Sequence, residues 1–179
     1  MILLLVLCPL RAASELTAGW QALADYRAAE AVQIFERAAK ADDPAAAREG
    51  RFGRAVALLA RQPIEPAQIE TARRMLAELV EDGKSDIALA ARFYLARIAQ
   101  HHAARPDEAA AMKYYRQIIE MKPESIWAQT ALSRLAILQI FPLDAVQTPA
   151  ERISRTEKLL DLAREIREVD MRASPYDCL

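Results

Sequence analysis

The stretch Ser85-x-x-Ala88-x-x-Ala91-x-x-x-Leu95-Ala96 is matched by Ser125-x-x-Ala128-x-x-Ala131-x-x-x-Leu135-Ala136, displaced by 125 − 85 = 40 residues. Serine is a common residue at the cap of a helix, and alanine has the highest helix propensity. The spacing of the apolar positions also fits one face of a helix. The two stretches therefore predict two equivalent helices that belong to successive copies of one repeated unit.

A second helix is predicted between the two copies. Ala111, Tyr115 and Ile118 stand at i, i+4 and i+7 and share one helix face, and Pro123 then ends the unit. The same three-point face recurs, more loosely in its last occurrence, at Ala31, Phe35 and Ala38, at Ala72, Leu76 and Leu79, and at Thr156, Leu160 and Ala163. Each repeated unit is therefore expected to be a pair of antiparallel helices.

The boundaries of these pairs follow from turn and capping residues. Asp43-Pro44 is typical of a helix start, because Asp caps free amides and proline fits the first helical position. In the helix expected from Pro44 to about Arg61, Gly50 and Gly53 indicate close packing against a neighbouring helix. The predicted segments are helix pairs at about 15–41, 44–82, 85–122 and 124–172, followed by a flexible tail over 173–179.

The composition favours an all-α protein and excludes some functions. Hydrophobic residues make up 53% of the 179-residue chain and charged residues 27%, as in ordinary globular proteins. A formal net charge of −1 argues against a nucleic-acid surface, which needs clustered cations. Cys8 and Cys178, at opposite ends, provide neither a disulfide framework nor metal-ligand spacing.

The N-terminus is predicted to be a signal peptide over residues 1–14. Residues 2–10 form an apolar run of the length of a signal-peptide core, and Ala12-Ala13-Ser14 offers the small residues of a cleavage site before Glu15. No charged side chain precedes the run, so a start further upstream stays open. A lipoprotein anchored at Cys8 and an uncleaved, buried first helix are the other readings.

No motif indicates catalysis, a cofactor or a metal ion. His101 and His102 are adjacent, so their rings are expected to diverge around a helix end instead of forming an i, i+4 metal pair. Cys178 has no nearby base in the sequence, and the four glycines are scattered instead of forming a phosphate-binding loop. The chain is expected not to be an enzyme.

The pattern of Ala111, Tyr115, Ile118 and Pro123 resembles the helix pairs of the tetratricopeptide family, and the likeness covers most of residues 14–140. The spacing between units is longer here, since successive faces lie 72 − 31 = 41 and 111 − 72 = 39 residues apart instead of roughly 34. Long units of this kind look most like bacterial cell-envelope members of the family. The resemblance implies a right-handed α-solenoid of about four antiparallel helix pairs.

In such an array, the first helix of each pair lines a concave surface that binds peptides or proteins. If the resemblance holds, six residues of the third and fourth pairs are exposed on that surface and contribute to protein binding: Phe93, Arg97, Gln100, His101, Ser133 and Ile137. Ordinary solvent-exposed surface is the alternative interpretation of these positions.

Thr148-Pro149-Ala150-Glu151 forms a capping box that predicts a long C-terminal amphipathic helix. Its apolar stripe comprises Leu159, Leu160, Ala163 and Ile166, and the spacing of Leu159, Ala163, Ile166 and Val169 also fits recognition of a helix in a groove. This helix is expected to cover the fourth pair, with docking on a partner as the alternative.

The resulting prediction is an exported, non-enzymatic protein-binding scaffold of a bacterial cell envelope. A structural subunit of a membrane-attached assembly, held by an uncleaved N-terminal segment, is the second hypothesis. No nucleic acid is expected among the partners. The identity of the protein or peptide partner, a peripheral membrane association and the oligomeric state are left open.

Overall fold

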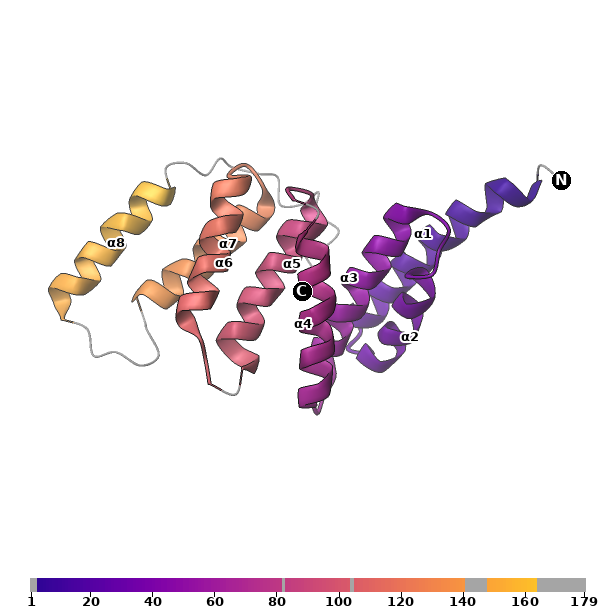
Figure 1. Cartoon of the computed structure of the whole chain (residues 1–179), viewed down its shortest axis with the longest axis horizontal. Helices are drawn as coiled ribbons and strands as arrows, with labels where there is room; N and C mark the ends of the chain where they lie inside the picture. Colours follow the sequence, from indigo (N-terminus) through magenta and orange to yellow (C-terminus); the bar gives the residue numbers. More distant parts are fainter. Residues whose placement is uncertain (1–2, 82, 104, 141–147, 164–179) are drawn as a thin grey trace. The chain divides into compact units, whose positions relative to one another are not determined.

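The computed structural model describes residues 3–81, 83–103, 105–140 and 148–163, and all regular elements in these ranges are helical (Figure 1). The helices fall into two compact units, which divide between Glu81 and Asp82. Within each unit, helices that follow one another in the chain pack together in antiparallel pairs. The all-α prediction is therefore confirmed, with eight α-helices in the described ranges.

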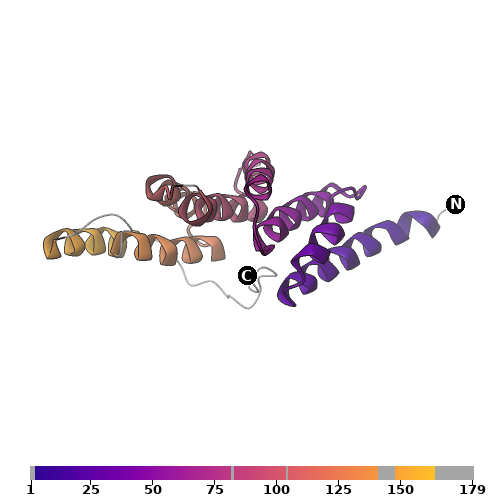
Figure 2. The ribbon, with the colours of Figure 1, turned by 90° about the horizontal axis from the view of Figure 1, so that it is seen from below.

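Unit 1 contains α1 (Leu3–Ala24), α2 (Ala28–Ala38), α3 (Pro44–Ala60) and α4 (Pro66–Val80). Figure 2 shows α1 beside α2 and α3; each of these three helices contacts the other two, and α4 packs on α3. As predicted, the Asp43 side chain caps α3, because its Oδ2 accepts a hydrogen bond of 3.0 Å from the backbone amide of Ala46.

The centre of unit 1 is the fully buried ring of Phe35 on α2. The ring of Trp20 on α1 meets it edge-on, with 4.8 Å between the ring centroids. A Cβ atom placed on Gly19 would lie 2.6 Å from Phe35 Cε1, and one placed on Gly53 would lie 2.5 Å from Phe35 Cδ1. The ring therefore occupies the space that side chains on α1 and α3 would need.

Gly50, one turn before Gly53 on α3, lies against the end of α2. A Cβ atom at this position would be 2.7 Å from the carbonyl carbon of Ala38, closer than real Cβ atoms approach such a group. The prediction that both glycines of α3 mark close helix packing is confirmed.

Unit 2 contains α5 (Asp86–Arg97), a π-helical turn η1 (Ile98–His102), α6 (Glu108–Met121), α7 (Ile126–Ile140) and α8 (Pro149–Ala163). α6 packs on α5 and α7, α7 also contacts α5, and α8 packs on α7. The two stretches that share a pattern begin their helices alike. Ser85 Oγ accepts from the Ala88 amide at 3.2 Å, and Ser125 Oγ accepts from the Ala128 amide at 3.0 Å.

Three of the four predicted helix faces are buried. The side chains concerned are Ala31, Phe35 and Ala38 on α2, Ala72, Leu76 and Leu79 on α4, and Ala111, Tyr115 and Ile118 on α6. The fourth prediction is wrong for Leu160 on α8, which is 56% exposed. The reason is that α7 alone among the described helices makes extensive contact with α8, so most of the α8 surface has no neighbour in the described ranges.

The contact between α7 and α8 is partly polar. The buried amide of Gln139, in the orientation that satisfies both neighbours, donates to the carbonyl oxygen of Arg155 at 3.2 Å and accepts from Arg116 Nη2 at 3.0 Å. Ile153 shares the exposed face with Leu160 and is 61% exposed.

α8 is short, with 15 residues, and the capping box predicted at its start is present between Thr148 and Glu151. The side chains of Leu159 and Ala163, and all of Ile166 and Val169, lie outside the described part of the chain. The apolar stripe as a whole thus stays a prediction, as do the covering and docking roles.

α1 begins at Leu3 and continues without a break through the predicted leader, whereas the first helix was expected to start near Ser14. Within the described residues, no helix is both long enough and apolar enough to span a bilayer. The signal peptide at 1–14 and the tail at 173–179 stay predictions.

Replacing Gly53 with Ala tests the packing around Phe35. Alanine favours a helix by about 1 kcal/mol over glycine, but its Cβ would overlap the Phe35 ring, and overpacking typically costs about 1–3 kcal/mol. We expect Gly53→Ala to lower the free energy of unfolding of unit 1. Urea unfolding followed by Trp20 fluorescence in a Trp127→Phe background measures this, since the chain has two tryptophans.

The matched control combines Gly53→Ala with Phe35→Leu, which removes the overlapping ring atoms. The two changes should together cost less than the sum of their separate effects. A Gly53→Ala protein that is more stable by about 1 kcal/mol, the helix-propensity gain alone, would contradict tight packing at this site.

Candidate protein-binding site

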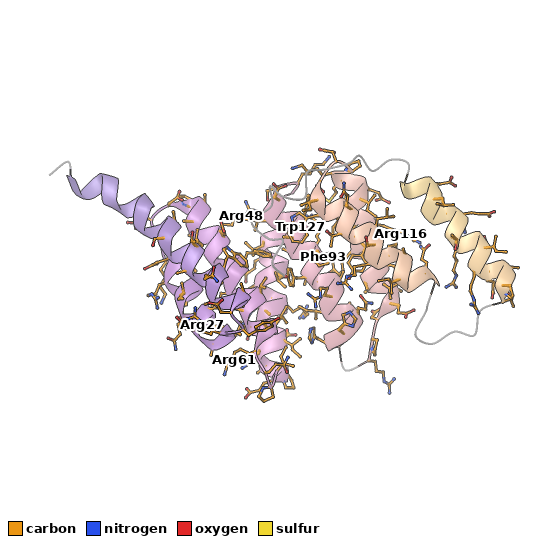
Figure 3. The ribbon with its side chains drawn as sticks, turned by 180° about the vertical axis from the view of Figure 1, so that it is seen from behind. Arg27, Arg48, Arg61, Phe93, Arg116 and Trp127 are labelled. Carbon is orange, nitrogen blue, oxygen red and sulfur yellow. The ribbon has the colours of Figure 1, made fainter. Side chains whose placement is uncertain are left out.

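The predicted binding residues lie on α5, η1 and α7 of unit 2, and Phe93 is the deepest of them. It is 5% exposed and its ring centroid lies 5.8, 5.6 and 5.5 Å from those of Tyr94, Tyr115 and Trp127 (Figure 3 labels Phe93 and Trp127). The prediction that Phe93 is exposed is therefore wrong. α5 is covered by both α6 and α7, so its residues from Ala88 to Ala96 are all buried.

Gln100 in η1 is also buried, at 7% exposure, so its predicted exposure is wrong as well. Its Oε1 accepts a hydrogen bond of 3.2 Å from the hydroxyl of Tyr115 on α6. Burial raises the pKa of Tyr115 to about 12, so the phenol keeps the proton that it donates. The amide of Gln100 thus ties η1 to α6 beneath the surface.

The other four predicted residues reach the surface. Arg97 is half-buried, His101 and Ser133 are exposed, and Ile137 is 48% exposed. Arg97 lies at the end of α5, His101 in the η1 turn that follows it, and Ser133 and Ile137 on α7, which contacts α5. The Ser133 hydroxyl donates a hydrogen bond of 3.1 Å to the carbonyl oxygen of Gln129. The role of these four residues in protein binding stays a prediction.

Arg134 on α7 was missed by the sequence analysis. Its positive charge acts on the imidazole of His101 in η1. The pKa of His101 is lowered first by partial burial and then by the positive charges of Arg97, His102 and Arg134. Arg97 and Arg134 also both act on the Tyr115 phenol between them in the chain. We call Arg97, His101, His102 and Arg134 the cationic cluster; its charge near pH 7 comes from the two guanidinium groups, because the lowered pKa values keep both imidazoles largely neutral.

A signal for Arg134 exists in the sequence. It follows Ser133 directly and precedes Ile137 by three residues, so it borders the α7 face that those two residues were predicted to form. Arginine on a helix surface is common, which is why the spacing alone did not single it out.

The π-helical turn brings both histidines close to Arg97. The amide of Ala103 donates to the carbonyl oxygen of Ile98 at 3.0 Å, an i to i+5 bond that adds a residue to the last turn. Partial burial and the charge of Arg97 lower the pKa of His102 as they do for His101. Two adjacent residues, expected to diverge, thus share one positive neighbour.

The two arginines of the cluster have no acidic partner within the described residues. Some other surface arginines in that part of the chain pair with carboxylates, as Arg27 does with Asp25 at 2.9 Å and Arg73 with Glu70 at 2.6 Å. Arg97 instead lies over the ring of Tyr94, with 5.7 Å from Cζ to the centroid. Among the residues that the structure describes, no carboxylate therefore forms an ion pair with the two guanidinium groups of the cluster.

Across the described ranges, no group of three or more His, Cys, Asp or Glu side chains is arranged to hold a metal ion. No protein-family model matches the chain, and no curated protein or solved structure is significantly similar to it.

Titration of the two histidines by NMR tests the geometry of the cluster. Both pKa values should lie below the ordinary value of 6.5. Arg97→Gln should raise both, whereas Arg134→Gln should raise that of His101 alone, because Arg134 acts on that imidazole only. In the wild-type protein, both histidines have a lower pKa in the folded state than in the unfolded chain, so the unfolded chain binds protons more readily. Unit 2 should therefore lose stability as the pH falls below about 6.5.

Arg152→Gln on α8 is the control, since this exposed arginine lies outside the cluster and should leave both titrations unchanged. An Arg134→Gln protein with an unaltered His101 pKa would contradict the closeness of Arg134 to His101. The two signals are assigned with His102→Gln, because the chain has only two histidines.

Proposed function

We propose that the chain is a non-enzymatic scaffold of the bacterial cell envelope that binds a protein or peptide partner. The binding face is the surface of unit 2 formed by α5, η1 and α7, which the tetratricopeptide-like reading of the sequence makes concave. The right-handed solenoid of that family is part of the same proposal.

The observation behind this proposal is that Arg97 and Arg134, which have no acidic partner among the described residues, lie on helices whose surface also exposes the apolar side chain of Ile137. Arginine is enriched at protein interfaces relative to the rest of the surface, and the buried core of an interface is more apolar than its rim. The buried aromatic cluster around Phe93 supports this surface from below and gives it a fixed form.

A crosslinked pull-down from host cells with the C-terminally tagged full-length protein tests the proposal. We expect the pull-down to recover one envelope protein in amounts comparable to the bait. Arg97→Glu and Ile137→Asp should each abolish this recovery, because each places a carboxylate in the binding face. Arg152→Glu, with the same charge change on an exposed position of α8, should retain it. Recovery of the bait alone, or equal recovery with all variants, would contradict a binding face here.

A second candidate is a structural subunit of a membrane-attached assembly, held by an uncleaved N-terminal segment. The observation that favours it is the unbroken helix α1, since the small residues Ala12, Ala13 and Ser14 of the predicted cleavage site lie inside it. Proteases cut chain that is locally unfolded and exposed.

Sequencing the N-terminus of the protein from cells separates the two candidates. If the segment is retained, residues 2–10 should be present and the protein should sediment with membranes. A mature protein that begins at Glu15 and stays in the soluble extract rules out the second candidate and agrees with export.

A further inference from the structure

The chemistry of the cationic cluster narrows the kind of partner. Its positive charge comes from two guanidinium groups, of Arg97 on α5 and Arg134 on α7, and these two helices pack against each other through Phe93 and Trp127. The two imidazoles of η1 lie beside them as polar groups, within a chain of net charge −1. Arg97 and Arg134 are half-buried, so water screens their charge less than it screens that of a fully exposed side chain. Carboxylates are the protein groups that complement guanidinium groups, often through paired hydrogen bonds.

We infer that this face binds an acidic segment of a partner protein. Its Asp or Glu carboxylates lie against Arg97 and Arg134, and a neighbouring apolar side chain packs on Ile137. The inference rests on the proposed function and adds to it the chemical class of the partner.

An extended polyanion fits this face less well than a short acidic segment. Nucleic acids and anionic membranes need a broad field of Lys and Arg, and the chain as a whole carries slightly more acidic than basic side chains, 25 against 24. Ile137 lies one helical turn after Arg134, so the face offers an apolar contact directly beside a charge. A phosphate backbone has no group to fill that position, whereas a peptide such as Asp-Glu-Leu does.

Selection of a phage-displayed library of random peptides against the full chain tests this inference. Enriched peptides should combine Asp or Glu with one large apolar residue. A fluorescent copy of an enriched peptide should bind at least about tenfold more tightly than its Asn and Gln counterpart, as measured by anisotropy. Arg97→Gln and Arg134→Gln should each weaken binding by about tenfold, with unchanged circular dichroism as the folding check.

The controls use the same assay. Arg152→Gln removes one positive charge from α8, outside the face, and should leave the affinity unchanged. Single-stranded DNA and phosphatidylglycerol vesicles, offered as alternative anions, should bind more weakly than the peptide. If either binds more tightly and depends on Arg97 and Arg134, the surface recognises phosphate and the inference is overturned.

Failure of the inference can be told from failure of the proposed function. Enrichment of neutral or basic peptides that are lost with Ile137→Asp would overturn the acidic partner but leave the binding face in place. Absence of any enriched peptide overturns the inference. If the pull-down also recovers no partner, the proposed function fails with it.

Discussion

The apolar faces of the helices in each unit can be buried only where neighbouring helices approach one another closely. A two-helix pair has an apolar face that only neighbouring helices can cover, so the distance between helices decides how much of that face is removed from water. In unit 1 this distance is set by Phe35, whose ring fills the space left by Gly19 on α1 and Gly53 on α3. The helix propensity lost at those glycines is offset by the burial of a complete aromatic side chain.

Much of the fold could be predicted because helical spacing and capping chemistry act locally. Ala111, Tyr115 and Ile118 share a face whatever lies beyond it, and their burial needed only that some neighbour exist. The caps at Asp43 and Ser85 are also local, since each side chain bonds an amide three residues later. Close packing could be predicted at Gly50 and Gly53 because glycine lowers the stability of a helix, and close packing against a neighbour can offset that loss.

The candidate site was harder to predict because exposure depends on how many neighbours a helix has. α5 contacts both α6 and α7, so Phe93 became part of an aromatic cluster instead of a surface. α8 packs mainly on α7 and leaves Leu160 exposed despite its apolar spacing. In both cases the sequence pattern predicts the helix correctly. It does not predict whether a second helix packs on it, and that second contact decides which residues are buried.

The π-helical turn shows why the members of the cationic cluster could not be predicted from sequence spacing alone. In a regular helix, His101 would share a face with Arg97 and His102 would turn away. The i to i+5 bond from Ala103 to Ile98 widens that turn, and partial burial together with the charge of Arg97 lowers the pKa of both imidazoles. Gln100, whose amide is tied to Tyr115 beneath them, leaves the two histidines as the polar groups of the turn that lie nearer the surface. Arg134 of α7 then completes a cluster drawn from three segments, and its position depends on the packing of α7 against α5, which no local pattern encodes.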